Sequence, residues 1–120
     1  MYSQQLLDHF QNPRNTGDLA DADAMVEVEN PVCGDVLRLS LKFRDGRIAE
    51  IKFKAKGCVP AIACGSALTE MALDKSAEQA RRLTREELTS VVGGLPQASS
   101  HAAQLALDAL FAALAKLRVE

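Results

Sequence analysis

The sequence predicts one α+β domain, in which a three-stranded antiparallel sheet packs against several helices. Three observations predict this fold class. Residues 37–43 and 49–55 alternate apolar and mostly charged side chains, and Asp45-Gly46 between them is a favoured hairpin turn. From Pro60 onward the apolar residues recur at helical spacing instead. The 120 residues fit a single domain spanning 1–120, with no repeat or linker.

The first element is a short amphipathic helix, because Tyr2, Leu6 and Phe10 recur at four-residue spacing. Pro13 ends it, since a residue that precedes proline avoids the helical region. Residues 24–30 (AMVEVEN) alternate and predict a strand. This strand should join the hairpin, because two strands alone are only marginally stable in water.

The hairpin should have one buried face and one solvent-facing face. Its charged positions include arginine, lysine and glutamate, which favour solvent. Such alternation is typical of an antiparallel sheet that helices cover on one side only. The positions expected to face the core are Leu37, Leu39, Leu41, Phe43, Ala49, Ile51, Phe53 and Ala55.

The second half of the chain predicts helices. Pro60 suits the first position of a helix whose core-facing stripe contains Ala61, Cys64, Leu68 and Met71. Residues 76–79 and 84–87 each match the capping box and imply two short helices, the second ended by Gly93-Gly94. The last helix should run from about His101 toward Arg118. Its expected buried stripe is Ala103, Leu107, Leu110, Phe111, Leu114 and Leu117.

Composition narrows the classes of function. The net charge is −2, so the chain lacks the basic excess of a nucleic-acid-binding protein. No apolar run is long enough to cross a bilayer, and Asp8 and His9 interrupt any signal-peptide pattern at the start. We therefore expect a cytoplasmic protein without a membrane or nucleic-acid partner. Its three cysteines should be reduced, and they form no C-x-x-C pair.

A candidate metal site begins in the segment ENPVCGDV (29–36), which places the thiol of Cys33 and the carboxylate of Asp35 two residues apart. Gly34 between them lets the backbone turn or approach a bound group closely. Cys58 precedes the predicted helix at Pro60, where the positive end of the helix dipole favours thiolate, the form that binds metal. His101 follows plausible capping serines in the first turn of the last helix, where a neutral imidazole is favoured.

Folding could bring these element ends together, so Cys33, Asp35, Cys58 and His101 are candidate ligands. The same residues also have ordinary interpretations from spacing alone. Asp35 could be a surface acid, Cys33 a turn residue and His101 a capping or solvated histidine. Cys64 lies on the apolar stripe, so core packing is the favoured interpretation for that thiol.

The segments NPVCGD, KGCVPAIAC and LPQASSHAAQLA, in this order, resemble the U-type iron–sulfur cluster scaffold family, which comprises IscU and the N-terminal domain of NifU. The opening segment DHFQNPRNTGDL resembles the start of that family. The resemblance covers nearly the whole chain, and it implies a three-stranded antiparallel sheet under helices. Cys33, Asp35, Cys58 and His101 match the metal-binding elements of the family.

The chain departs from the family pattern at two places. Members carry a cysteine directly after the matching histidine, where this chain has Ala102, and that thiol is a cluster ligand and sulfur acceptor in the family. Residues 95–99 (LPQAS) keep only the Leu-Pro of the segment that members present to an Hsp70-type chaperone, so such a partner is not supported. Cys64 stands where members usually have serine and could substitute for the missing thiol.

The resemblance implies a scaffold that binds iron, a [2Fe–2S] cluster or zinc and hands clusters to acceptor proteins, with a cysteine desulfurase as a further partner. The alternative is a zinc-stabilised or metal-free paralogue that acts as an interaction module without carrying a cluster. A homo-oligomer is compatible with either. We expect that the protein is not an enzyme. A thiol enzyme that uses Cys58 and His101 would need an oxyanion site and a residue that orients the base, and the sequence reveals neither.

Overall fold

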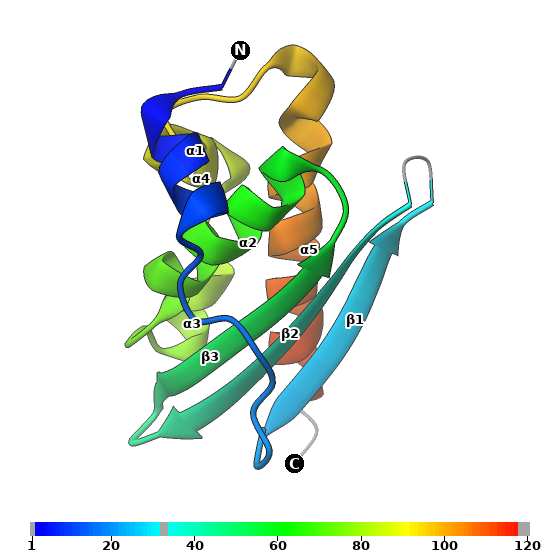
Figure 1. Ribbon diagram of the computed structural model, residues 1–120. Helices are drawn as coiled ribbons and strands as arrows, with labels where there is room; N and C mark the ends of the chain where they lie inside the picture. Colours follow the sequence, from blue (N-terminus) through cyan, green and yellow to red (C-terminus); the bar gives the residue numbers. More distant parts are fainter. Residues whose placement is uncertain (1, 32–33, 118–120) are drawn as a thin grey trace.

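A twisted antiparallel sheet in the order β1-β2-β3 forms one layer of the structure, and helices form the other (Figure 1). The computed structural model describes residues 2–31 and 34–117. The predicted fold class is confirmed. The elements are α1 (Gln4–Gln11), β1 (Ala24–Asn30), β2 (Asp35–Arg44), β3 (Arg47–Lys56), α2 (Val59–Ala72), α3 (Ala77–Arg81), α4 (Arg85–Val91), η1 (Gln97–Ser99) and α5 (Ser100–Lys116).

The hairpin of β2 and β3 turns at Asp45-Gly46, as the sequence predicts. Both residues adopt positive φ, 57° and 78°, which matches the twist of the flanking strands. The register shifts between Lys42 and Phe43. Because of this irregularity Ile48 is buried in place of the expected Ala49, so the predicted alternation is wrong at this end of β3.

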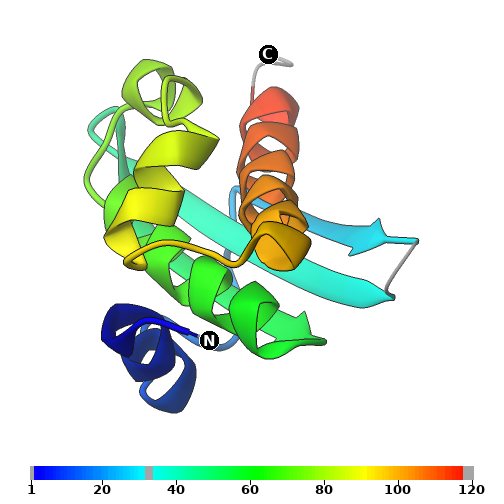
Figure 2. The same ribbon diagram turned by 90° about the horizontal axis from the view of Figure 1, so that it is seen from above.

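The helices α2 and α5 cover the inner face of the sheet. α2 packs on β3 and α5 on β1 and β2, while α1 lies against α2 on the side away from α5 (Figure 2). Gly65 permits the close approach of α2, because a Cβ there would lie 2.8 Å from the ring of Phe53. None of the helices in the described ranges is long and apolar enough to cross a bilayer.

Both predicted capping boxes are present, at the starts of α3 and α4. The stripe predicted for α5 is only partly correct, since Phe111 and Leu117 are half-buried. Small residues share the buried face of this helix instead and let it lie close to the sheet: Ala102, Ala103, Ala106, Ala109 and Ala113. Ser99 occupies the N-cap position of α5 but makes no side-chain capping bond, contrary to the sequence expectation.

A polar cluster that the sequence did not reveal joins α1 to α2. His9 Nδ1 lies 2.8 Å from Ser66 Oγ, which also accepts a hydrogen bond from the Arg14 backbone N–H. The Glu70 carboxylate lies 3.8 Å from His9 Nε2. His9 is only 7% exposed, and burial, reinforced by the charge of Arg14, lowers the pKa of its imidazole below the ordinary 6.5.

The chain between α1 and β1 partly covers the sheet. Phe53 on β3 donates its N–H to the Asn15 carbonyl and accepts from the Gly17 N–H, both at 2.9 Å. After Gly17 the chain leaves the edge of β3 and crosses the outer face toward β1 (Figure 1). There Asp18 pairs with Arg38 at 3.2 Å and with Lys54 at 3.4 Å. Beyond this crossing, no backbone of the described residues pairs with the outer edge of the part of β3 that leads to α2.

Candidate metal centre

Three of the four predicted ligands come together at one end of the sheet. Asp35 is the first residue of β2, Cys58 is the N-cap of α2, and His101 lies in the first turn of α5. Each contributes one potential ligand atom, and these atoms all lie within 4.8 Å of one another. That they bind metal stays a prediction. Cys33, the fourth predicted ligand, lies outside the described residues.

Asp35 is the centre of this group. Its residue is 3% exposed, and its Oδ1 accepts a hydrogen bond of 3.2 Å from the Cys58 backbone N–H. The other oxygen, Oδ2, lies 3.2 Å from Cys58 Sγ and 3.9 Å from His101 Nε2. The carboxylate therefore touches both other candidate ligands, at the positive end of the α2 dipole, where a negative charge is stabilised.

Gly57 makes room for this carboxylate. Its φ of +153° lies in a region that residues with a side chain rarely adopt. A Cβ at this position would lie 2.1 Å from Asp35 Oδ1 and 2.6 Å from Asp35 Cγ, inside any real contact distance. The glycine before Cys58 thus lets the buried carboxylate lie directly against the backbone that leads into α2. No function was assigned to this glycine from the sequence.

Cys64 and Ala102 both lie in the core. Cys64 is fully buried, as the apolar stripe predicted, and burial, followed by the nearby Cys58, raises the pKa of its thiol to about 12. The protonated thiol is a poor metal ligand. Ala102 is 1% exposed and packs with the core side chains of α5. Cys64 is not among the described residues whose ligand atoms converge, so its role as a substitute ligand stays a prediction that this conformation does not support.

The described part of the site offers one sulfur, one oxygen and one imidazole nitrogen. This mixture suits borderline metals such as zinc and iron, which accept thiolate, imidazole and carboxylate together. Cys58 is solvent-accessible and the side chain of His101 is 38% exposed, whereas Asp35 is buried. An ion could therefore reach the group from solvent on the Cys58 and His101 side.

Comparison with known proteins places this fold and site in context. The family model described as NifU-like N terminal domain matches residues 1–119. The iron–sulfur cluster assembly scaffold protein IscU 1 of Archaeoglobus fulgidus is 49% identical over 110 residues, which cover 92% of this chain and 72% of the relative. The scaffold protein IscU of Haemophilus influenzae is 39% identical over 123 residues, or 99% of this chain and 97% of the relative.

Solved structures agree on the fold. The crystal structure of the N-terminal part of a nitrogen-fixing NifU-like protein from Brucella abortus has a TM-score of 0.77 at 21% identity, and it covers 96% of this chain and 92% of that one. The match of the family model over nearly the whole chain, together with relatives above 30% identity, leads to one conclusion: the chain belongs to the family of NifU-like N-terminal domains, which includes the IscU scaffolds.

Proposed function

We propose that this protein is an iron–sulfur cluster assembly scaffold, which binds iron or a [2Fe–2S] cluster as cargo at Cys33, Asp35, Cys58 and His101 and hands it to acceptor proteins. The observation that carries the proposal is the convergence of the Asp35, Cys58 and His101 ligand atoms within 4.8 Å. Related proteins named as cluster assembly scaffolds support the cargo. Zinc is an additional ion that this donor set suits.

The proposed role of Asp35 follows from its place in the group. Its carboxylate supplies an oxygen where a fully sulfur-ligated site would supply a thiolate. A cluster held partly by oxygen and nitrogen is bound less firmly than one held by thiolates alone, because iron–sulfur clusters prefer thiolate. Weak retention suits a carrier, whose cargo must leave. We therefore assign Asp35 as the ligand that keeps the cargo transferable.

The alanine at position 102 supports the proposal that the cargo is weakly held, because it leaves the site with fewer thiolates. Where the resemblance to the scaffold family implies a thiol after the histidine, this chain has the buried methyl group of Ala102. Fewer thiolates lower the negative charge around a cluster and raise its reduction potential, as histidine ligation does in Rieske centres. The proposal therefore includes a cluster that is easier to reduce than one with more thiolate ligands.

Anaerobic reconstitution with iron and sulfide tests the function. We expect the visible absorption of a cluster in the wild type and its loss in Cys33→Ala and Cys58→Ala. Cys64→Ala is the matched control, since it also removes one thiol but from the core, and it should retain the absorption. Absence of a cluster in the wild type, or equal absorption in Cys58→Ala, would contradict the proposal.

Elemental analysis of protein purified without added iron identifies the resident metal separately. One zinc per chain that depends on Cys58, without any cluster after reconstitution, would instead support the zinc-stabilised paralogue. The proposal further includes a cytoplasmic location and a cysteine desulfurase and cluster acceptors as partners. Pull-down with a desulfurase from the same cell, followed by cluster loading from iron, cysteine and a thiol reductant that requires this desulfurase, tests the desulfurase as a partner.

A further inference from the structure

The open end of β3 carries unpaired backbone groups on the edge of the sheet. The N–H and C=O of Phe53 point away from β2, as their hydrogen bonds to the backbone of Asn15 and Gly17 show. Ala55 lies two residues further along the strand, so its N–H and C=O point the same way. Within residues 2–31 and 34–117 these two groups have no hydrogen-bond partner, because the chain leaves the edge at Gly17.

An apolar groove lies beside this edge on the side that faces α2. It has a volume of about 440 Å³. It is lined by Pro13, Thr16 and Gly17 of the chain after α1, by Phe53, Lys54 and Ala55 of β3, and by Ile62 of α2. An added strand that paired with Ala55 would point its central side chain into this groove, because directly opposed residues share a face of the sheet.

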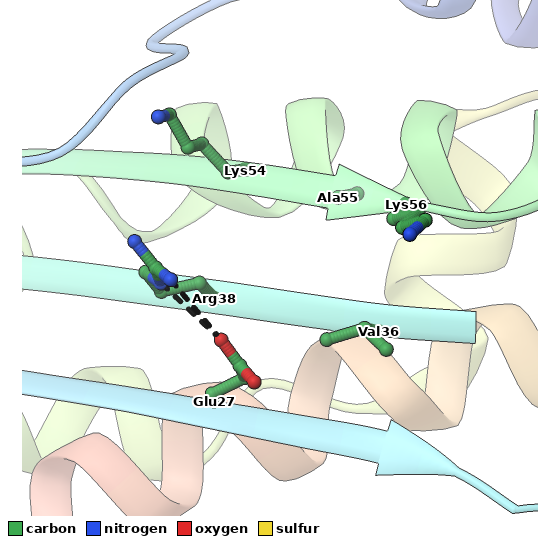
Figure 3. A pocket seen from close by; sticks show the side chains of 6 residues that line it. All are labelled: Glu27, Val36, Arg38, Lys54, Ala55 and Lys56. Carbon is green, nitrogen blue, oxygen red and sulfur yellow. Dashed lines mark hydrogen bonds and ion pairs between the residues drawn. The ribbon is translucent and has the colours of Figure 1, made fainter. Parts of the chain in front are cut away.

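Basic side chains flank the same edge on the outer face. Figure 3 shows Lys54 and Lys56 on either side of Ala55. With Glu27, Val36 and Arg38, these three residues line a pocket of about 470 Å³. Lys56 makes no ion pair with any described residue, and Lys54 shares Asp18 with Arg38. The residues of an added strand on either side of its central one would lie beside these two lysines.

We propose that this edge is a docking site for an extended segment of a partner protein, in which an apolar residue stands between two acidic residues. Backbone hydrogen bonds to Ala55 fix the register of the bound segment, and its acidic-apolar-acidic pattern determines which segments bind, as in other cases of strand addition. Charge complementarity selects an acidic partner over a second copy of this chain. Pairing two such edges would set lysine against lysine, which is unfavourable.

The edge lies close to the candidate metal centre, so a partner bound to it would be held next to that centre. β3 ends at Lys56, and Cys58, the N-cap of α2, follows two residues later. A partner that extends the sheet here is held beside the Asp35, Cys58 and His101 group without touching its ligand atoms. The inference depends on the sheet edge and not on the metal chemistry, so it stands or falls independently of the proposed function.

Titration of the isotope-labelled 120-residue chain with a short capped peptide tests this site by amide NMR. The probe carries Glu-Val-Glu between Gly-Ser flanks, and the control peptide carries Lys-Val-Lys. We expect the acidic peptide to shift the amide signals of Lys54, Ala55 and Lys56 and to bind more weakly as salt rises. The basic peptide should leave these signals unchanged.

Three variants separate the contribution of the edge N–H to peptide binding from that of the lysine charges. Ala55→Pro removes only the edge N–H, which the ladder with β2 does not use, and should abolish the shifts. Lys54→Glu combined with Lys56→Glu should weaken binding at least about tenfold, since two attractive cross-strand pairs become repulsive. Lys42→Glu makes the same kind of charge change at the far end of the outer face and should bind like the wild type.

The results that would overturn the inference are specific. Equal binding of both peptides, full binding by Ala55→Pro, or no shift at Ala55 at millimolar peptide would each do so. If no peptide binds and the double glutamate variant merely self-associates, the lysines serve only to protect an edge strand, and the docking site is refuted. Cys58→Ala should bind the acidic peptide unchanged, which keeps this result distinct from failure of the proposed function.

Discussion

Replacing Gly57 by alanine tests how Asp35 is held in the candidate metal centre. The new Cβ would lie 2.1 Å from Asp35 Oδ1, 2.6 Å from Cγ and 3.0 Å from the Asp35 Cβ. Rotation of the carboxylate relieves the first two contacts but leaves the third tight. The rotation also removes the acceptor of the Cys58 N–H, whose bond to Oδ1 is 3.2 Å long.

The expected cost is the sum of two effects. A side chain at the unusual φ of Gly57 costs about 1–3 kcal/mol of unfolding free energy. Loss of a charge-assisted hydrogen bond to a buried carboxylate costs about another 1–3 kcal/mol. We therefore expect Gly57→Ala to lower the unfolding free energy by roughly 2–6 kcal/mol. Displacement of one oxygen donor should also weaken zinc binding.

Gly46→Ala is the matched control. Its φ is +78°, and no atom lies within 4 Å of the position its Cβ would take, so only the backbone cost of about 1–2 kcal/mol applies. Denaturant unfolding gives both free energies, and competition with a chromophoric chelator gives the zinc affinities. Equal destabilisation by the two substitutions, with zinc affinity unchanged in Gly57→Ala, would refute the described role of Gly57.

Three further predictions concern the core and α1. Gly65→Ala should destabilise the protein by about 1–3 kcal/mol in denaturant unfolding, because its Cβ would overlap the Phe53 ring. A stabilised variant would show instead that α2 can shift away from β3 without cost. Because the folded pKa of His9 is lowered, the unfolded chain binds its proton first, so stability should be full above about pH 6.5 and fall as the pH drops toward that lowered value. His9→Gln should flatten this part of the pH profile, and an unchanged slope would count against the assignment. Alkylation at mildly alkaline pH, mapped by mass spectrometry, should modify Cys58 but spare Cys64 until the protein is denatured; equal labelling in the native state would disprove the burial of Cys64.

Local patterns were sufficient to predict most of the fold. The alternation in the hairpin and the Asp45-Gly46 turn depend on neighbouring residues, and so do the two capping boxes. The register shift near Phe43 was not visible, because it depends on how two strands align over their whole length. The contact between His9 and Ser66 was also missed, because it joins residues 57 positions apart through a single polar pair.

The candidate site was accessible from the sequence only in part. The character of Cys58 and His101 as helix-start residues could be argued locally, but their approach to Asp35 depends on how α2 and α5 pack against β2. Spacing alone therefore left ordinary interpretations open for each residue, and the ordered resemblance to a scaffold family favoured the metal site. Gly57 was missed because the clash that requires a glycine involves a carboxylate more than twenty positions earlier in the chain.

The three ligand atoms come from the start of one strand and the starts of two helices that are distant along the chain. An unfolded chain does not hold them together, so any ion bound there would bind the folded state only and would raise the free energy of unfolding. The melting temperature should then rise with free metal concentration, and chelators should lower it. The melting temperature would thus report whether an ion is bound, and a partner that loosens the start of α5 would lower the affinity for that ion by the same linkage.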